Sequence, residues 1–476
     1  MKTQLFKTEE FEKMASDVRR VLAEIGYVVD HPLVKELAIK SGCRESAVGR
    51  ILFDNTMIEE LRQKLLRQYP PVKPSDEPSL IHPKREFKTG IGNLTPKFYD
   101  YENDRPEGGN LRRFTEMVKF AHAEPRVTSI TLPISRQDTA PEIEQLEGVV
   151  LMSGLTDKPF GGVDATVPEA VPFIAEMGIA LGLNPARFVG CCNCINPPLR
   201  LEYRTAETML QRRKYHSRSM ITPMPSIGGS GPADIRGTIV LGTAEIVGGL
   251  ILSSIIDPEA PLLGYIACNQ VDMLTGNGSS CTPQTVRVDS GVCQLMEYAF
   301  GGGTTVGGRS YVNARRPGLQ AVFERTLKAA GYAAFVDRGS MIYAGSGNLD
   351  NGSMISPEQC LLDWEVMGGL DCLFTAPEFD FNDDVFGRIC ETVLKSNGNF
   401  LETEHTLNHF RDERWNSVYF QARSDTQSEK SILDRCHGEF LDKLDSYRQA
   451  EYPDNIRKEL ESILKNAKKH LMVTSQ

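Results

Sequence analysis

The chain has 476 residues, 40% of them hydrophobic and 24% charged, which is the composition of a globular protein with a large core. Its formal charge of −10 disfavours a nucleic-acid partner. Eleven scattered cysteines lack framework spacing, and the N-terminus lacks the apolar region of a signal peptide, so reduced thiols in a cytoplasmic protein are expected. The most apolar run, Ile246 to Ile256, is too short to span a bilayer, and no membrane association is expected.

The first part of the chain is predicted to be helical. Thr8 can cap a helix whose apolar positions between Phe11 and Leu22 recur at helical spacing, and Gly26 can stop it. Shorter helices are expected around residues 34–40 and 57–68. The proline-rich stretch YPPVKPSDEP is typical of a linker, and the strand-like stretch FKTGIGNLTPKFYDYEND follows it.

From Arg126 onward, short apolar runs alternate with amphipathic helices, which indicates βαβ units and a parallel sheet. The strand candidates are RVTSITLPIS, KPFGGVDAT, RFVGCCNCIN, SMITPMPSI, PLLGYIACNQ, GGGTTVGGRSYV and SMIYAGSGN. Seven such units favour an α/β fold of the TIM-type (β/α)8 barrel over an open sheet. The eighth strand is either LDCLFTA or the stretch from Gly90 to Tyr99.

These changes of pattern predict three parts. They are an N-terminal helical segment over residues 1–75, a barrel with its preceding strand region over 76–378, and a C-terminal helical extension over 379–476.

The glycine-rich stretch PSIGGSGPAD lies between a predicted strand and a long apolar helix. Loops after the strands of a parallel barrel carry its functional groups. Ser230 can cap the helix and Pro232 fits its first turn, while Gly228, Gly229 and Gly231 let the backbone approach a ligand and direct N–H groups at an anion. The alternative to a ligand-binding role for these glycines is a structural one, in which the stretch is a tight βα turn that needs positive φ. A Walker loop is excluded because no Gly-Lys-Ser/Thr follows.

Three other motifs carry weaker signals. AGSGNLDNG has only two of the glycines of a nucleotide loop. In CCNC, the alternate residues Cys192 and Cys194 share one face of a strand and could contribute to a zinc site, but buried cysteines are also ordinary core residues. His405 and His409 have the spacing of zinc ligands on a helix without the accompanying His-Glu-x-x-His, so a packed or exposed helix face is the expectation. We therefore expect no tightly bound metal.

The predicted loop ends carry polar and aromatic side chains that can bind a ligand. They are Asp138, Asp164, Asn193, Ser226, Asn269, Asp272, Arg309, Tyr311, Asn313, Tyr343 and Asn348. The alternative for each is ordinary loop packing.

Taken together, these residues resemble the trimethylamine methyltransferase superfamily of corrinoid-dependent methyltransferases. The strongest match is TPMPSIGGSGPADIRGTIVLGTAEIVGGLILSSIIDPEAPLLGY, and DMLTGNG, NARRPGLQA, GSGNLDNGSMISPEQCLLDWE and NFLETEHTLNHFRDERW follow in the family's order. The resemblance covers most of the chain, to about Tyr419.

The sequence departs from the family at two points. Members often carry Asp-x-Lys-x-Pro-Asp near the sixth strand, where NARRPGLQ here has Asn313 and Gly318 at the Asp positions. Members that act on trimethylamine use pyrrolysine, which this sequence lacks. The resemblance to the non-pyrrolysine branch implies a quaternary amine as substrate: glycine betaine, proline betaine, carnitine or butyrobetaine.

The chemistry of a quaternary amine agrees with that branch. Its nitrogen is already a leaving group, so a Co(I) corrinoid can attack a methyl carbon without a proton donor, and the protein's task is alignment. Aromatic faces suit the cation, and the candidates are Tyr99, Tyr265, Tyr311 and Tyr343. A betaine carboxylate needs donors, which Arg309, Asn313 or the amides of Gly228 to Gly231 can supply. The glycine-rich loop is thus expected to face substrate or corrinoid.

The corrinoid (cobalamin) is expected on a separate cognate corrinoid protein, because the chain lacks the Asp-x-His-x-x-Gly motif that binds it. A homo-oligomer is also expected. Two rival interpretations remain: a zinc-dependent or other TIM-barrel enzyme that uses CCNC, and a betaine-binding barrel that has lost catalysis.

Overall fold

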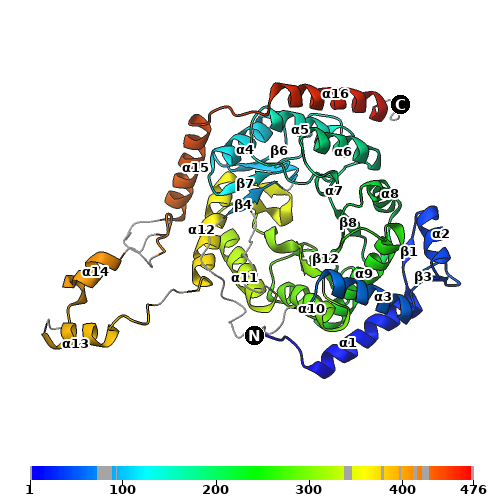
Figure 1. The fold of residues 1–476 in the computed structure, drawn as a ribbon, viewed down its shortest axis with the longest axis horizontal. Helices are drawn as coiled ribbons and strands as arrows, with labels where there is room; N and C mark the ends of the chain where they lie inside the picture. The colour runs from blue at the N-terminus through cyan, green and yellow to red at the C-terminus, as the bar shows by residue number, and fades with distance from the viewer. Residues whose placement is uncertain are drawn as a thin grey trace.

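The computed structural model describes residues 3–71, 88–92, 94–336, 346–376, 380–395, 398–410, 415–420 and 428–472. Strands lie on the inside of a ring and helices surround them, while the N-terminal helices and the last helix lie on the periphery (Figure 1). The structure is therefore of the mixed α/β kind that the alternating pattern predicts.

The N-terminal segment is helical, as predicted. Its elements are α1 (Thr8–Arg20), the π-turn Val21–Ile25, β1 (Val28–Val29), α2 (Pro32–Lys40), β2 (Arg44–Glu45), β3 (Ile51–Leu52) and α3 (Asn55–Gln68). Thr8 is the first helical residue rather than the cap, since the Lys7 backbone N–H donates to the Glu10 carboxylate in a capping box. Gly26, with φ of 66°, ends the helical run, and the Asp54 side chain caps α3.

The central strands pair in parallel. They are β4 (Thr89–Ile91), β7 (Val127–Ile130), β8 (Cys192–Ile195), β10 (Ser219–Pro223), β12 (Leu262–Ile266) and β15 (Thr304–Val306). β4 pairs with β7, and β8, β10, β12 and β15 form one sheet in that order. Parallel bridges Ile130↔Phe160 and Val163↔Val189 link the two groups through the predicted strand KPFGGVDAT.

The predicted crossover helices are all present. The helices of this region are α4 (Leu111–Ala123), α5 (Glu144–Ser153), α6 (Val171–Ala180), α7 (Pro185–Phe188), α8 (Tyr203–Arg212), α9 (Ile235–Ile256), α10 (Pro283–Ala299), α11 (Leu319–Phe335) and α12 (Pro357–Leu373), with 3-10 turns at Pro168–Ala170, Arg213–Tyr215, Gly308–Ser310 and Asp350–Gly352.

A closed barrel is not established. Within the described residues no ladder joins β15 to β4, and most of the predicted strand SMIYAGSGN lies outside them. LDCLFTA as a strand is wrong, because α12 continues to Leu373. The alternative stretch does contribute β4, which pairs in parallel with β7.

Smaller strands cover the ring: β5 (Lys97–Asp100) and β6 (Arg105–Gly108) with β16 (Asn348–Leu349) and β17 (Met354–Ile355), β11 (Ser226–Ile227) with β13 (Asn269–Val271) and β14 (Gly278–Ser279), and β9 (Arg200–Leu201) with β1.

α9 is the central helix of the larger hydrophobic core. It is long and apolar enough to cross a membrane by length and composition, but most of it is buried inside the protein, which is what the core helix of a large fold requires. α1, α2 and α3 cover its outer side, where the Tyr27 ring lies against Gly248, and the Ile221 side chain of β10 lies against Gly249. The N-terminal helices thus lie outside the ring.

The C-terminal extension consists of α13 (Val385–Lys395), the 3-10 turn Phe400–Glu402, α14 (Glu404–His409), α15 (Glu429–Asp445) and α16 (Asp454–Leu471). α15 packs on α12 and α4, and α16 packs on α5 and α6. α13 and α14 stand away from the ring (orange in Figure 1).

Candidate active site

A row of side chains crosses the inner face of the parallel sheet near its carboxyl edge. The ladders place Cys194 beside Thr222, and Tyr265 beside Thr305. Alternate residues of the same strands, such as Ile221 and Ile266, pack into the core formed with α9 and α10. Because side chains alternate along a strand, Cys194, Thr222, Tyr265 and Thr305 point away from those helices and toward the inside of the ring.

Cys192 and Cys194 form a thiol pair on this inner face. Their Sγ atoms are 4.0 Å apart, and Cys192 Sγ lies 3.4 Å from Thr222 Oγ1. The hydrogen bond between the thiols lowers the pKa of Cys194 and raises that of Cys192, whose burial raises it further. Burial raises the pKa of Tyr311, and the charges of the two thiols add to this effect. The phenol is therefore within electrostatic range of the thiol pair.

A buried guanidinium holds the amino end of β8 from behind. Arg212 donates to the Cys192 carbonyl (2.9 Å), to Asn193 Oδ1 (3.1 Å) and to Asp164 Oδ1 (2.8 Å). Asn193, 2% exposed, also donates to Ser219 Oγ (2.9 Å). Asn193 thus points away from the inner face. Asp164 also accepts a hydrogen bond from the Cys192 backbone N–H (3.3 Å).

A charged layer lies buried beneath the loop after β15. Burial raises the pKa of Asp289 to about 7, although Lys328, the Tyr332 hydroxyl (2.7 Å) and the Cys268 N–H (2.8 Å) favour its ionised form. Burial lowers the pKa of Lys328, whose Nζ donates to the carbonyls of Gly308 and Tyr311. This layer is not among the predicted site residues, because lone charged residues inside helices carry no local sign of burial.

The loop after β15 contains two of the predicted ligand-binding residues, Arg309 and Tyr311. β15 ends at Val306 and a 3-10 turn follows, so strand parity does not place Arg309 and Tyr311 on one face. The Arg309 guanidinium lies 5.2 Å from the centre of the buried Tyr332 ring. The Tyr311 ring lies against Gly352, near the thiol pair.

Asn313 and Asn348 hold the same region together in different ways. The Asn313 amide donates to Ser279 Oγ (2.6 Å) and accepts from the Ser280 N–H (2.9 Å). Asn348 is fully buried, its carbonyl accepts from Arg325 (3.0 Å), and its side-chain amide has no hydrogen-bond partner among the described residues.

The glycine-rich loop uses its amides internally. The N–H groups of Gly229 and Gly231 both donate to the Ser226 carbonyl (2.9 Å), and Ser230 Oγ accepts from the Ser226 N–H (3.0 Å). α9 begins at Ile235 and Asp234 caps it, so the prediction that Ser230 caps the helix was wrong. Gly228 has φ of 76°, which is the positive φ that a tight turn needs.

The loop packs on the β13–β14 hairpin. Ser226 pairs with Asn269, and Val271 lies against Gly229. Asp272 caps the turn of that hairpin, since its carboxylate accepts from the Leu274 N–H (2.8 Å).

Two predicted residues lie elsewhere and one is not described. Tyr99 is buried in β5 and donates to Asp104, and Asp138 accepts from the Leu111 N–H at the start of α4. Tyr343 lies outside the described residues.

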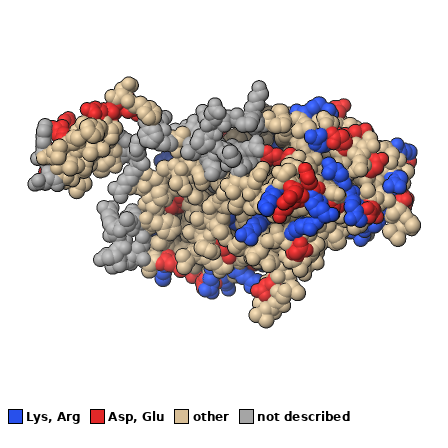
Figure 2. All heavy atoms as spheres, turned by 90° about the horizontal axis from the view of Figure 1, so that it is seen from below, with Lys and Arg blue, Asp and Glu red and all other residues tan. Residues whose placement is uncertain are grey.

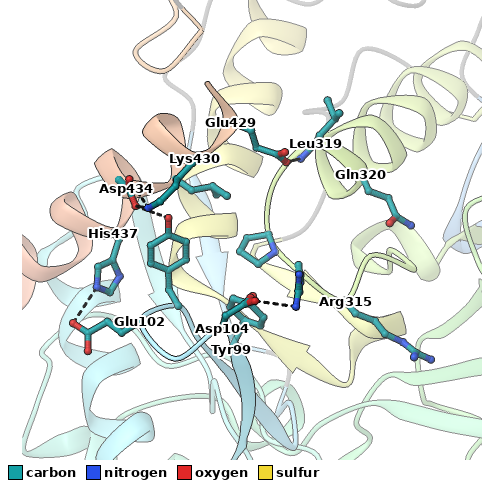
Figure 3. Close-up of a pocket in the computed structure, with 14 residues that line it drawn as sticks. Tyr99, Glu102, Asp104, Arg315, Leu319, Gln320, Glu429, Lys430, Asp434 and His437 are labelled. Atoms are coloured by element: carbon teal, nitrogen blue, oxygen red, sulfur yellow. Dashed lines mark hydrogen bonds and ion pairs between the residues drawn. The ribbon is translucent and has the colours of Figure 1, made fainter. Parts of the chain in front are cut away.

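Tyr99 borders a cavity of about 890 Å³ between β5–β6, the start of α11 and α15 (Figure 3). Its charged groups are largely paired: Asp104 with Arg316 (2.8 Å), Asp434 with Lys430 (3.0 Å) and Glu102 with His437 (3.5 Å).

Among the described residues, no three His, Cys, Asp or Glu side chains are grouped to hold a metal ion. The rings of His405 and His409 are neighbours on α14, with centres 4.6 Å apart and planes tilted by 38°, far along the chain from the thiol pair. Among the described residues, the inner face offers the Tyr265 ring and a thiol pair, with the Tyr311 phenol within electrostatic range of the thiols. Such a surface suits a bulky cation that has lost its water.

Comparison with known proteins identifies a family that this chain matches. The model of the family described as "Trimethylamine methyltransferase (MTTB)" matches residues 1–471. Trimethylamine methyltransferase MttB of Desulfitobacterium hafniense (strain DSM 10664 / DCB-2) is 21% identical over 79% of this chain and 75% of its own. The glycine betaine methyltransferase of D. hafniense (strain Y51) is 21% identical over 94% of this chain and 93% of its own.

Among solved structures, the hydroxylamine complex of MtmB covers 97% of this chain and 92% of its own, at 10% identity and a TM-score of 0.42. A score this low does not establish a common fold.

Proposed function

Because the chain belongs to the trimethylamine methyltransferase (MTTB) family, we propose that it demethylates a quaternary amine and passes the methyl group to the Co(I) corrinoid of a separate protein. The relative named glycine betaine methyltransferase supports the quaternary amine, since it matches 94% of the chain. The absence of pyrrolysine from the sequence supports the same branch. Glycine betaine, proline betaine, carnitine and butyrobetaine are the proposed substrates.

The proposal is supported by two tyrosines: Tyr265 in the inner row of the sheet, and Tyr311, whose phenol is within electrostatic range of the thiol pair. A quaternary ammonium cannot donate a hydrogen bond, so it gains from aromatic faces, at about 0.5–2 kcal/mol for each ring. The Tyr265 ring lies against Gly307, where a larger side chain would collide with it. The two rings are the proposed cation site.

The reaction needs alignment more than acid–base chemistry. The methyl carbon moves from nitrogen to cobalt, the C–N electron pair stays on nitrogen, and a neutral tertiary amine leaves without a proton. Positive charge on the amine is lost as the bond breaks, so a site with little water favours the step. Holding nitrogen, carbon and the acceptor in line can lower the barrier by roughly 7–11 kcal/mol.

The substrate's carboxylate is the less constrained part of the proposal. Arg309, Asn313 and the amides of the glycine-rich loop remain its proposed donors, but each already has partners in the structure. Recognition of the carboxylate by any of them would require local rearrangement. The corrinoid protein is proposed to dock at the carboxyl edge of the strands, where the glycine-rich loop is exposed.

We also propose that the parallel strands close into a (β/α)8 barrel. Parallel pairing runs from β4 through β15, and Ser346 Oγ donates to the Gly90 carbonyl (3.0 Å), which brings the chain before β16 to the free edge of β4. An experimental structure with an open edge between β15 and β4 would contradict this.

The test is a substrate screen under reducing conditions with free cob(I)alamin. The four betaines and trimethylamine are compared, with methylcobalamin followed by absorbance and the tertiary amine by mass spectrometry. We expect turnover with at least one betaine and none with trimethylamine. Turnover with trimethylamine alone contradicts the substrate class. Betaine binding without transfer, to free cobalamin or to a cognate corrinoid protein, identifies a silent binding protein instead.

A further inference from the structure

The C-terminal extension contains an exposed apolar arm. We use "arm" for residues 380–395 and 398–410, which hold α13, the 3-10 turn Phe400–Glu402 and α14, and which project from the ring in Figure 1. Phe386, Leu394, Leu401 and Leu407 are 77%, 80%, 84% and 71% exposed. Large contiguous apolar surfaces are rare on monomeric proteins and mark contacts with another molecule.

α13 has two apolar stripes with different environments. Val385 and Ile389, one turn apart, line a cavity of about 690 Å³ that α13 forms with Phe400 and α14, inside the arm. Phe386 and Leu394, two turns apart, form an adjacent stripe that is more exposed. The second stripe is free to pack on a helix of another molecule.

The ring carries a matching surface on α11. Leu319 and Phe323, one helical turn apart, are 72% and 65% exposed, and Arg315 and Arg316 precede them in the chain. We call these four residues the α11 patch. The two arginine side chains are 72% and 70% exposed although they pair with Asp350 and Asp104. A guanidinium has five donors, so each retains capacity for another carboxylate.

The charges of the arm and the α11 patch are complementary. The arm has six acidic residues, Asp380, Asp383, Asp384, Glu391, Glu402 and Glu404, and two basic ones, Arg388 and Lys395. Its acidic side chains are visible at the far left of Figure 2, whereas the mixed charges of the body gather at the opposite end of that face.

We propose that the arm of one copy packs the Phe386–Leu394 stripe of α13 on the α11 patch of a second copy, and that the second copy's arm does the same in return. The same chain supplies both surfaces, so a two-fold axis closes the pair with two equal contacts and leaves no open end. The arm carboxylates then lie near Arg315 and Arg316. This assembly does not depend on the proposed enzymatic activity.

The test starts from the mass of the full chain in solution, measured by light scattering at micromolar concentration. We expect at least a dimer. Phe386→Asp in the arm and Phe323→Asp in the α11 patch should each raise the dimer dissociation constant at least tenfold. Val48→Asp is the matched control, because Val48 is 81% exposed on the N-terminal segment and lies in neither surface. Circular dichroism and thermal melting verify that each variant folds.

A mixing experiment separates this arrangement from others. Phe386→Asp has an intact α11 patch and Phe323→Asp has an intact arm, so a mixture of the two retains one of the two contacts. We expect the mixture to form a heterodimer that neither variant forms alone.

Three results would overturn the proposal. A monomeric parent chain excludes a second copy and leaves another protein as the occupant of the arm. A dimer sensitive to Phe386→Asp but not to Phe323→Asp indicates that arms pair with arms. A dimer insensitive to both variants places the interface elsewhere.

Discussion

The Sγ atoms of Cys192 and Cys194 lie 4.0 Å apart on the inner face of β8, close enough for one thiol to donate to the other. This contact lowers the pKa of Cys194, so Cys194 is the thiol that ionises first. Alkylation requires the thiolate, and its rate therefore rises with pH through that pKa. Cys192→Ala removes the donor, and we expect iodoacetamide to label Cys194 roughly tenfold more slowly at pH 7.

Peptide mass spectrometry measures the labelling, and Cys191→Ala is the control. Burial raises the pKa of Cys191, which precedes the strand, and its removal leaves the pair intact. The difference between parent and Cys192→Ala should shrink at pH 9.5, where Cys194 is largely ionised in both proteins. Equal labelling of Cys194 at pH 7 in the two proteins would show that the contact has no influence.

Replacement of Tyr311 tests the proposed cation site. Tyr311→Leu should weaken betaine binding by about 1–2 kcal/mol, roughly ten- to thirtyfold, because the aromatic face is lost. Tyr311→Phe keeps the face and should cost much less. Michaelis constants on the best betaine, measured with thermal stability, check both variants. Equal constants for the Leu, Phe and parent proteins would leave Tyr311 a packing residue.

Glu245 should make the protein less stable at higher pH. Burial in α9 raises its pKa to about 8, against the effect of the Leu199 N–H, which donates to it at 2.8 Å. The folded state then holds a proton that the unfolded state releases above about pH 4.5. The free energy of unfolding that this group contributes is fully present below that pH. It decreases as the pH rises to about 8, by at most about 1.4 kcal/mol per pH unit.

Glu245→Gln removes this titration. Urea unfolding at pH 5 and pH 8 should show the variant gaining stability relative to the parent as the pH rises. Glu36→Gln, at an exposed position on α2, should leave the pH dependence of the parent unchanged. A parent and Glu245→Gln with parallel pH profiles would mean that Glu245 titrates normally.

The ion pair between Arg325 and Asp363 should be costly to break. The two groups are 3.0 Å apart and fully buried, and Asp363 also accepts from the Gly347 N–H (2.8 Å). Asp363→Ala leaves a buried guanidinium uncompensated, at an expected cost of about 3–5 kcal/mol of unfolding free energy.

The exposed pair Arg20–Glu24 supplies the comparison, since Glu24→Ala should cost less than about 1 kcal/mol. Urea unfolding measures both variants. The double replacement Arg325→Met, Asp363→Leu should recover part of the loss by removing both charges. A cost of Asp363→Ala as small as that of Glu24→Ala would mean that water reaches Arg325.

The spacing of apolar residues predicted the helices well, because an amphipathic helix can be recognised from neighbouring residues in the sequence alone. The buried stripe of α1 and the alternation from β7 to α12 are examples. Helix starts were less predictable: Ser230 and Asp234 are both good caps, and the loop's own hydrogen bonds to Ser226 decide between them.

The site was harder to predict than the fold. Alternation along a strand identifies which residues share a face of the sheet. Only the pairing of the strands shows that Cys194 points into the ring and Asn193 away from it. The alternation rule also no longer applies where a strand ends early, as β15 does before Arg309. Asp289 and Lys328 have the residue types of a surface, and only tertiary packing shows that they are buried.

The placement of α9 between the N-terminal helices and the sheet has a consequence for synthesis on the ribosome. α1 and α3 emerge first, but the helix that covers their apolar sides is made much later in the chain. At about 5–20 residues per second, α9 is complete roughly 10–40 s after α3. During that interval the side chains of Phe11, Val18 and Leu65 lack the α9 surface that covers them in the folded protein, so we expect the nascent N-terminal segment to depend on chaperones until α9 arrives.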